Sequence, residues 1–237
     1  MPEKGILYLI PTTLGDTAET ADVIPQKVIT VINSTDEYIV ENEKTARHYL
    51  KKAGLKKPLQ EIILHPLNQH TDPGVISAYL KSINEGKNIG IISEAGCPGI
   101  ADPGSEVVRI AHSHNIRVVP LVGPSSILLA LMSSGFNGQS FTFHGYLPKE
   151  RTDRIRKIRE LEKNALQKDQ TQLFIETPYR NMHMMEDLIT TCDSRTKLCI
   201  ACDITLPTEF IKTRMIGDWK KSVPEISKRP AIFALGK

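Results

Sequence analysis

The sequence predicts an α/β protein made of two domains, each built on a mainly parallel or mixed sheet. Short apolar runs alternate with amphipathic stretches along all 237 residues, the pattern of strands that alternate with helices. The chain is longer than most single domains and 40% of it is hydrophobic, so two cores can form. The pattern changes after Gly135, and we expect a first domain over residues 1–138 and a second over 139–237.

The elements of the first half follow from apolar runs and from helix start and stop signals. Asp72 and Asp102 each precede a proline, which is typical of a helix N-cap followed by the first turn. Pro25 is expected to break a helix over 17–34, with a short strand near 28–32. The other expected strands are 6–10, 36–41, 62–65, 87–93 and 116–122, and the other expected helices are 42–54, 72–86, 101–115 and 125–135.

The second half begins with residues 137–150, which we expect to form a linker into the second domain. Residues 151–168 have apolar side chains at helical spacing and predict an amphipathic helix. The remaining expected elements are strands at 171–176, 197–205 and 231–236, a helix at 180–192, and a strand or hairpin at 209–219.

The cysteines do not favour a metal or redox site. Cys199 and Cys202 have the C-x-x-C spacing, but they lie in a predicted strand, where residues three apart face opposite sides of the sheet. Structural zinc needs four ligands, and the seven histidines do not cluster with these thiols. We therefore expect buried thiols and no metal.

Charge and hydropathy set broad limits on location and partners. The formal net charge of +3 permits a nucleic-acid partner without indicating one. The apolar run near the N-terminus is only about five residues long, too short for a signal peptide or a membrane span. We expect a cytoplasmic protein that does not enter a membrane.

Irregular loops follow neighbouring predicted strands at 11–16, 93–104 and 122–126. Ligands of open parallel sheets bind outside the carboxyl ends of the strands, and glycine lets the backbone approach a ligand closely. The loops therefore predict a pocket for a small polar molecule. Alternatively, glycine and proline only shape tight turns there. The sequence lacks the G-x-x-x-x-G-K-[ST], G-x-G-x-x-G and G-x-S-x-G motifs, so the usual nucleotide and hydrolase motifs are not present.

The chain resembles the tetrapyrrole methylase superfamily in the stretches LYLIPTTLGD, SEAGCPGIADPGSEVVRIA, VPLVGPSSILLALMSSGF with FHGYLP, and ETPYR. These occur in order over nearly the whole chain, and the block from 93 to 148 is the most specific. Within the superfamily the chain is most similar to the ribosomal RNA small subunit methyltransferase I branch, which methylates a ribose 2′-hydroxyl.

This resemblance implies a fold, a cofactor and an assembly. The fold would be two α/β domains that hold S-adenosylmethionine in the cleft between them, usually in a homodimer. Carried over by position, the cofactor contacts would be Leu14, Cys97, Ile100, Ser126, Ile127, Thr177, Ala201, Cys202 and Ala231.

Methyl transfer to a ribose hydroxyl benefits from a general base. Glu94 follows a predicted strand directly and is our first candidate, with Glu41 next. Asp102 and Glu176 also lie at strand ends or in edge loops, and any of the four can instead close a loop or cap a helix. The substrate motifs depart from the branch, because Asn42 and Lys44 stand where it has Asp and Arg. A His-Asn-Glu segment of the branch is replaced here by NQHTD, residues 68–72.

The predicted helix over 151–168 is rich in arginine and lysine and could bind RNA phosphates, or it could be a solvated face. We expect an S-adenosylmethionine-dependent methyltransferase that acts on a ribose 2′-hydroxyl of ribosomal RNA. The alternatives are a methyltransferase of the same fold that acts on a porphyrin or corrin ring, and a non-catalytic assembly factor that only binds the cofactor.

Overall fold

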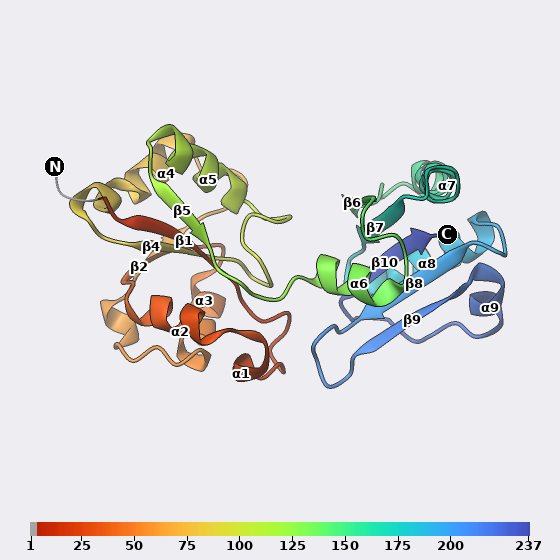
Figure 1. The fold of residues 1–237 in the computed structure, drawn as a ribbon, viewed down its shortest axis with the longest axis horizontal. Helices are drawn as coiled ribbons and strands as arrows, with labels where there is room; N and C mark the ends of the chain where they lie inside the picture. The colour runs from red at the N-terminus through yellow and green to blue at the C-terminus, as the bar shows by residue number, and fades with distance from the viewer. Residues whose placement is uncertain (1–3) are drawn as a thin grey trace. The chain divides into compact units, whose positions relative to one another are not determined.

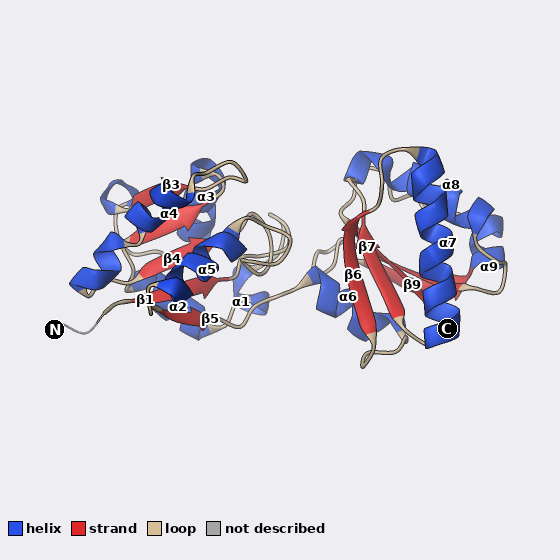
Figure 2. Ribbon diagram, turned by 90° about the horizontal axis from the view of Figure 1, so that it is seen from above, coloured by secondary structure: helices blue, strands red, loops and turns tan. Residues whose placement is uncertain are grey.

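Residues 4–237 are described by a computed structural model in which the chain divides into two units, one up to Ser125 and one from Ser126 onward. Each unit contains a five-stranded sheet covered by helices (Figures 1 and 2), which confirms the predicted α/β class. The division precedes helix α6 (Ser126–Ser134), whereas the sequence pattern changes after it. The reason is packing, because α6 lies against strands of the second sheet.

The sheet of the first unit is entirely parallel, with strand order β3-β2-β4-β1-β5. Its strands are β1 (Ile6–Ile10), β2 (Glu37–Val40), β3 (Ile63–Pro66), β4 (Ile89–Ile92) and β5 (Arg117–Pro120). The central strands β2 and β4 are buried along their whole length, as continuous apolar runs in a parallel sheet predict. Gly90 is required in β4, because a Cβ there would lie 2.6 Å from Ile10 Cδ1 and 2.8 Å from Tyr38 Cδ1.

Helices cover both faces of this sheet, with α2 and α3 on one face and α4 and α5 on the other (Figure 1). The first-unit helices are α1 (Thr20–Val23), α2 (Gln26–Asn33), α3 (Glu43–Lys52), α4 (Pro73–Tyr79) and α5 (Gly104–Ser113), with short 3-10 turns η1 (Leu59–Glu61) and η2 (Lys81–Glu85). Asp72 caps α4 as predicted, since its Oδ1 accepts a hydrogen bond from Gly74 N at 2.7 Å.

The short strand expected near residues 28–32 is wrong, because those residues lie inside α2. Val28, Val31 and Ile32 are all buried, and their i, i+3, i+4 spacing places them on one helix face. All five residues from 28 to 32 are β-branched and favour a strand locally, but packing of the buried face against the first sheet favours the helix.

The sheet of the second unit is mixed, with order β6-β7-β10-β8-β9. Its strands are β6 (Phe141–Tyr146), β7 (Thr171–Ile175), β8 (Lys197–Cys202), β9 (Phe210–Met215) and β10 (Ala231–Gly236). β6 pairs with β7 in parallel, and the other pairs are antiparallel. The linker expected over 137–150 is therefore wrong, because six of its residues form the edge strand β6.

The core of the second unit lies between this sheet and the helices α7 (Arg151–Lys168), α8 (Asn181–Thr191) and α9 (Ile216–Lys221). A 3-10 turn, η3 (Pro178–Arg180), precedes α8. Cys202 of β8 belongs to this core, whereas Cys199 is buried outside it. Cys199 and Cys202 are buried free thiols, as expected, and Cys192 is a third, whereas the free thiol of Cys97 is half-buried. No group of three potential metal ligands occurs within residues 4–237.

Helix α7 is the longest helix and the most charged. Its cations are not all available to a partner, because several pair with acids nearby. Arg154 is buried and binds the buried carboxylate of Asp187, with Arg154 Nε 2.7 Å from Asp187 Oδ2. Among the described residues, no helix is both long and apolar enough to cross a membrane.

Replacement of Arg154 by Ala should destabilise the second unit by about 3 kcal/mol or more, because it leaves the Asp187 carboxylate buried with weaker compensation. Arg156→Ala on the same helix is the matched control. Its ion pair with Asp153 is exposed, so the expected loss is no more than about 0.5 kcal/mol. Urea unfolding measures both changes, and equal losses would contradict the structural role of Arg154.

Candidate functional site

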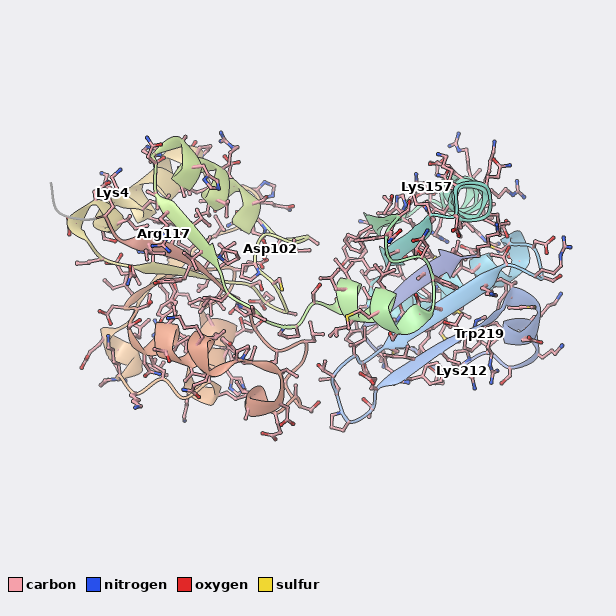
Figure 3. All side chains as sticks on the ribbon, viewed as in Figure 1. Lys4, Asp102, Arg117, Lys157, Lys212 and Trp219 are labelled. Carbon is pink, nitrogen blue, oxygen red and sulfur yellow. The ribbon has the colours of Figure 1, made fainter. Side chains whose placement is uncertain are left out.

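The candidate site of the first unit lies at one edge of its sheet. Since all five strands are parallel, their carboxyl ends meet at that edge, and the loops that follow β1, β4 and β5 begin there. Figure 3 shows Asp102, in the loop after β4, at the opposite end of this unit from Lys4 and Arg117, which lie where β1 and β5 begin. The loops predicted from the sequence therefore gather as expected.

These loops approach one another through their main chains. Thr12 N, after β1, donates to Gly96 O, after β4, at 2.9 Å. Gly96 has a positive φ of 75°, and a Cβ there would lie 3.1 Å from Leu14 Cδ2 and 3.3 Å from Pro124 O. Glycine is needed at this position for its backbone conformation as well as for the close packing.

The loop after β5 is packed in the same way. A Cβ on Gly123 would lie 2.2 Å from Pro11 Cβ, so only glycine lets these two loops touch. The Cys97 thiol donates to Pro124 O at 3.4 Å, and burial raises its pKa. Leu14 and Cys97, both predicted cofactor contacts, are thus brought to one junction of three loops.

Ile100, the third predicted cofactor contact in this unit, lies in the turn that closes the loop after β4. Its N–H is 3.4 Å from Cys97 O, and its side chain is 54% exposed. An exposed isoleucine beside a glycine-rich loop is available to an apolar group of a ligand.

Asp102 holds this loop together. Its Oδ1 accepts hydrogen bonds from Gly99 N at 2.7 Å and from Gly104 N at 2.8 Å. The sequence predicted Asp102 as the N-cap of α5, but Pro103 occupies that position. Asp102 lies one residue before the N-cap and still bonds to the first turn of the helix. Burial raises the pKa of Asp102, and the two N–H donors oppose that rise.

The predicted bases Glu41 and Glu94 lie at the same edge but in different surroundings. The pKa of Glu41 is raised, chiefly by partial burial and then by the nearby Asp102 carboxylate, while the backbone N–H of Glu94 lowers it. The Glu94 side chain is exposed and accepts a hydrogen bond from Thr45 Oγ1 at 2.6 Å. Partial burial and the neighbouring carboxylate therefore make it easier for Glu41 to take up a proton than for an ordinary glutamate.

The two carboxylates line different cavities, both within the first unit. The larger cavity, of about 1160 Å³, is lined by Glu41, Leu67, Asn68, Gln69, His70, Thr71, Asp72, Pro73, Ile76, Gly99, Ala101, Asp102, Pro103, Ser105 and Glu106. The smaller cavity, of about 520 Å³, is lined by Thr12, Thr13, Gly15, Asp16, Lys44, Thr45, Ala46, His48, Tyr49, Lys52, Ile92, Ser93 and Glu94. The sequence placed both acids at strand ends but did not reveal that they face different spaces.

In the second unit, three of the predicted cofactor contacts are neighbours in the sheet. The register of β8 and β10 places Cys202 opposite Ala231 and Ala201 opposite Ile232. Ala201, Cys202 and Ala231 are all buried, so a ligand at this edge would meet mainly their backbone. Thr177 lies just beyond the end of β7, which pairs with the other side of β10.

Ser126 and Ile127 form the first turn of α6 and are half-buried. The amide groups of a helix's first turn have no partners within the helix, so they can bind polar groups of a ligand. The far end of this helix is fixed to the second sheet, because Thr213 Oγ1 donates to Ser134 O at 2.7 Å.

The sequence reasoning missed the ion pair between Asp203 and Arg229. Arg229 Nε donates to Asp203 Oδ2 at 2.8 Å, and Thr208 Oγ1 donates to the same oxygen at 2.7 Å. Asp203 directly follows β8, and Arg229 lies two residues before β10, so the pair ties together the segments next to Cys202 and Ala231. The partners lie 26 positions apart in the sequence, which conceals this contact.

Sequence comparison identifies relatives over most of the chain. Residues 7–218 match the Tetrapyrrole (Corrin/Porphyrin) Methylases. A protein of Haemophilus influenzae is 30% identical over 225 residues (95% of this chain, 75% of that protein). One of Escherichia coli O157:H7 is 28% identical over 226 residues (95% and 74%). Both are named Ribosomal RNA small subunit methyltransferase I.

Solved structures share the fold. The methyltransferase CobJ aligns with a TM-score of 0.64 at 17% identity and covers 98% of this chain and 94% of its own. Cobalt precorrin-4 methyltransferase CbiF aligns with a TM-score of 0.62 at 17% identity (97% and 94%). Uroporphyrin-III C-methyltransferase from Thermus thermophilus, complexed with S-adenyl homocysteine, aligns with a TM-score of 0.55 at 15% identity (98% of each). The sequence match, together with this shared fold, shows that the chain belongs to the tetrapyrrole methylase family.

Proposed function

We propose that this chain is a methyltransferase that transfers the methyl group of S-adenosylmethionine to a ribose 2′-hydroxyl of ribosomal RNA. One observation carries the proposal: curated relatives that are 28–30% identical over most of both chains bear the name Ribosomal RNA small subunit methyltransferase I. The sheet edge of the first unit supports it with closely packed glycine loops and a partly buried carboxylate.

The loops fit this cofactor in shape and in charge. Gly96 and Gly123 let the loops after β1, β4 and β5 pack closely around one junction, and the buried Thr12 Oγ1 there has no hydrogen-bond partner among residues 4–237. The cofactor's sulfonium is cationic, and the carboxylates of Glu41, Glu94 and Asp102 at the same edge complement a positive charge. Leu14, Cys97 and Ile100 would supply its contacts from this unit. We also propose Ser126, Ile127, Thr177, Ala201, Cys202 and Ala231 as cofactor contacts.

When bound, S-adenosylmethionine supplies a methyl group on a good leaving group. The chain has to align the accepting hydroxyl with that methyl group, and alignment alone can lower the barrier by roughly 7–11 kcal/mol. Glu41 would accept the hydroxyl proton as the oxygen–carbon bond forms and the carbon–sulfur bond breaks. Its raised pKa suits that role better than the exposed, hydrogen-bonded carboxylate of Glu94.

A porphyrin or corrin ring is the second candidate substrate, because the solved structures of similar fold include corrin and uroporphyrin methyltransferases. Those proteins are only 15–17% identical to this chain and share the fold alone, whereas the relatives named for ribosomal RNA are nearly twice as similar. The RNA substrate is therefore the better supported of the two.

The partner and location follow from the same proposal. Of the α7 cations, Arg159 and Lys163 are exposed and form no ion pair with a described residue, so they are free to bind RNA phosphates. We place the protein in the cytoplasm, where ribosomal RNA of a small subunit would be its partner, and we propose a homodimer. Light scattering of the purified protein would test the assembly.

Transfer of labelled methyl groups tests the function directly. Purified protein is incubated with labelled S-adenosylmethionine and small ribosomal subunits, and the RNA is then treated with alkali. The label should stay in fragments that alkali does not cleave, because a 2′-O-methyl group blocks cleavage of the adjacent bond. Uroporphyrinogen and naked RNA serve as alternative acceptors. Label in uroporphyrinogen alone would replace the proposal with the ring substrate, and cofactor binding without transfer to any acceptor would support a non-catalytic assembly factor.

Gly123→Ala should weaken binding of S-adenosylmethionine by at least about tenfold, because the new Cβ would overlap Pro11 and force the loops after β1 and β5 apart. Gly138→Ala is the control, since nothing lies within 4 Å of a Cβ at that position. Isothermal titration calorimetry gives both dissociation constants. Unchanged binding by Gly123→Ala would show that these loops do not hold the cofactor.

Glu41→Gln should lower kcat by roughly 10²–10⁴-fold, as removal of a general base does, while Glu94→Gln should have a smaller effect. A base acts in its ionised form, and the pKa of Glu41 lies above that of an ordinary glutamate. The wild-type rate should therefore fall on acidification at a higher pH than that of an ordinary carboxylate, and Glu41→Gln should lose this dependence. The exposed Glu43→Gln is the control, and a larger loss with Glu94→Gln would reverse the assignment.

A further inference from the structure

The larger cavity of the first unit differs in charge from the smaller one beside it. Four carboxylates line it, from Glu41, Asp72, Asp102 and Glu106, and neither lysine nor arginine does. Lys44 and Lys52 both line the smaller cavity. Arg109 pairs with Glu106, but no described lysine or arginine forms an ion pair with Glu41, Asp72 or Asp102. A phosphate that entered the larger cavity would therefore meet like charges that no cation neutralises, which is unfavourable at short range.

The larger cavity nevertheless suits a polar, uncharged group. Its volume of about 1160 Å³ exceeds what a nucleoside needs, and its walls combine hydroxyl, amide and imidazole side chains with Leu67 and Ile76. Carboxylates accept hydrogen bonds from the hydroxyls of a ribose and from the amino groups of a base. Such a wall favours the sugar and base of a nucleotide and disfavours its phosphate.

One wall is the turn from Asn68 to Asp72, whose shape is set by its own hydrogen bonds. Asn68 N donates to Thr71 Oγ1 at 2.9 Å, and His70 N donates to Asn68 Oδ1 at 2.8 Å. At the end of the turn, Asp72 is fixed as the cap of α4. The turn is therefore ordered before any ligand binds, which lowers the entropic cost of binding.

The turn leaves side-chain amide groups available at the cavity. Within residues 4–237, the Asn68 Nδ2 group and the Gln69 Oε1 atom form no hydrogen bond, and both side chains are exposed. Asparagine and glutamine read base edges by pairing an amide donor and acceptor with those of the base. In RNA this readout requires an unstacked, single-stranded nucleotide.

We propose that the larger cavity binds the nucleoside that receives the methyl group, with Asn68 and Gln69 on the edge of its base and Glu41 beside its ribose. The proposal rests on the function proposed above and adds the part of the substrate that enters the cavity. The phosphates on either side of this nucleotide remain outside the cavity.

Ligand-observed saturation-transfer NMR tests the proposal with cytidine, uridine and their 5′-monophosphates. The protein is first loaded with S-adenosylhomocysteine, so that the cofactor site is filled, and pyrimidines are used because they do not mimic its adenosine. We expect saturation transfer to both nucleosides, and binding of the monophosphates at least about tenfold weaker. Equal or tighter binding of the monophosphates would overturn the proposal.

Two variants locate the contact. Gln69→Ala removes an amide whose one hydrogen bond is to the neighbouring His70 side chain and not to the backbone of the turn. Asn68→Asp keeps the Oδ1 acceptor while it removes the Nδ2 donor. Each should weaken nucleoside binding severalfold and leave the dissociation constant of S-adenosylhomocysteine unchanged. Gln167→Ala, on the exposed part of α7, is the control. If neither variant weakens binding, while circular dichroism shows both folded, the cavity is not the nucleoside site.

The outcome is separable from that of the proposed function. A protein that methylates RNA but binds neither nucleoside at this cavity would overturn this inference alone. A protein that binds cytidine here, sensitive to Gln69→Ala, but transfers no methyl group to RNA would contradict the proposed function and leave the ligand class of the cavity standing.

Discussion

Close contact between main chains at the carboxyl edge of the first sheet is the constraint on which the candidate site depends. The parallel register delivers the ends of β1, β4 and β5 to one place, and the loops can meet only because Gly96 and Gly123 lack a Cβ. The hydrogen bond from Thr12 N to Gly96 O then fixes two of the loops at a set distance. Glycine is required at each junction because a Cβ would collide with the neighbouring loop, and not because the loop has to be flexible.

The carboxylates at this edge of the first sheet have different surroundings. One carboxylate oxygen of Asp102 accepts hydrogen bonds from two backbone N–H groups, so this residue mainly stabilises the shape of the loop. Glu41 is left close to it in a partly buried position, and burial together with like charge makes proton uptake by Glu41 easier. Glu94, one strand end away, faces a space that also contains Lys44 and Lys52. Adjacent carboxylates can thus differ in role because their surroundings differ.

In the second unit, antiparallel pairing brings the predicted contact residues of different strands to one edge of the sheet. β7 and β8 both run antiparallel to β10, so the carboxyl ends of the first two lie beside the start of the third. Asp203 adopts a positive φ of 50° immediately after β8, a conformation that costs energy for any residue except glycine, although less for aspartate than for most others. Its ion pair with Arg229 and its hydrogen bond from Thr208 offset that cost and hold the edge in one arrangement.

The sequence by itself determined the α/β class, most of the strands and the three loops, because buried parallel strands are continuous apolar runs and glycine and proline mark where they end. The prediction from sequence is wrong at Val28–Ile32, where a β-branched run resembles a strand but forms a helix, and at the edge strand β6, which resembles a linker. In both places the structure depends on packing partners that the local sequence does not reveal. Only the tertiary structure decided that Glu41 and Glu94 line different cavities and that Asp203 binds Arg229. Those relations depend on distances between residues far apart in the chain, and local sequence patterns carry no information about such distances.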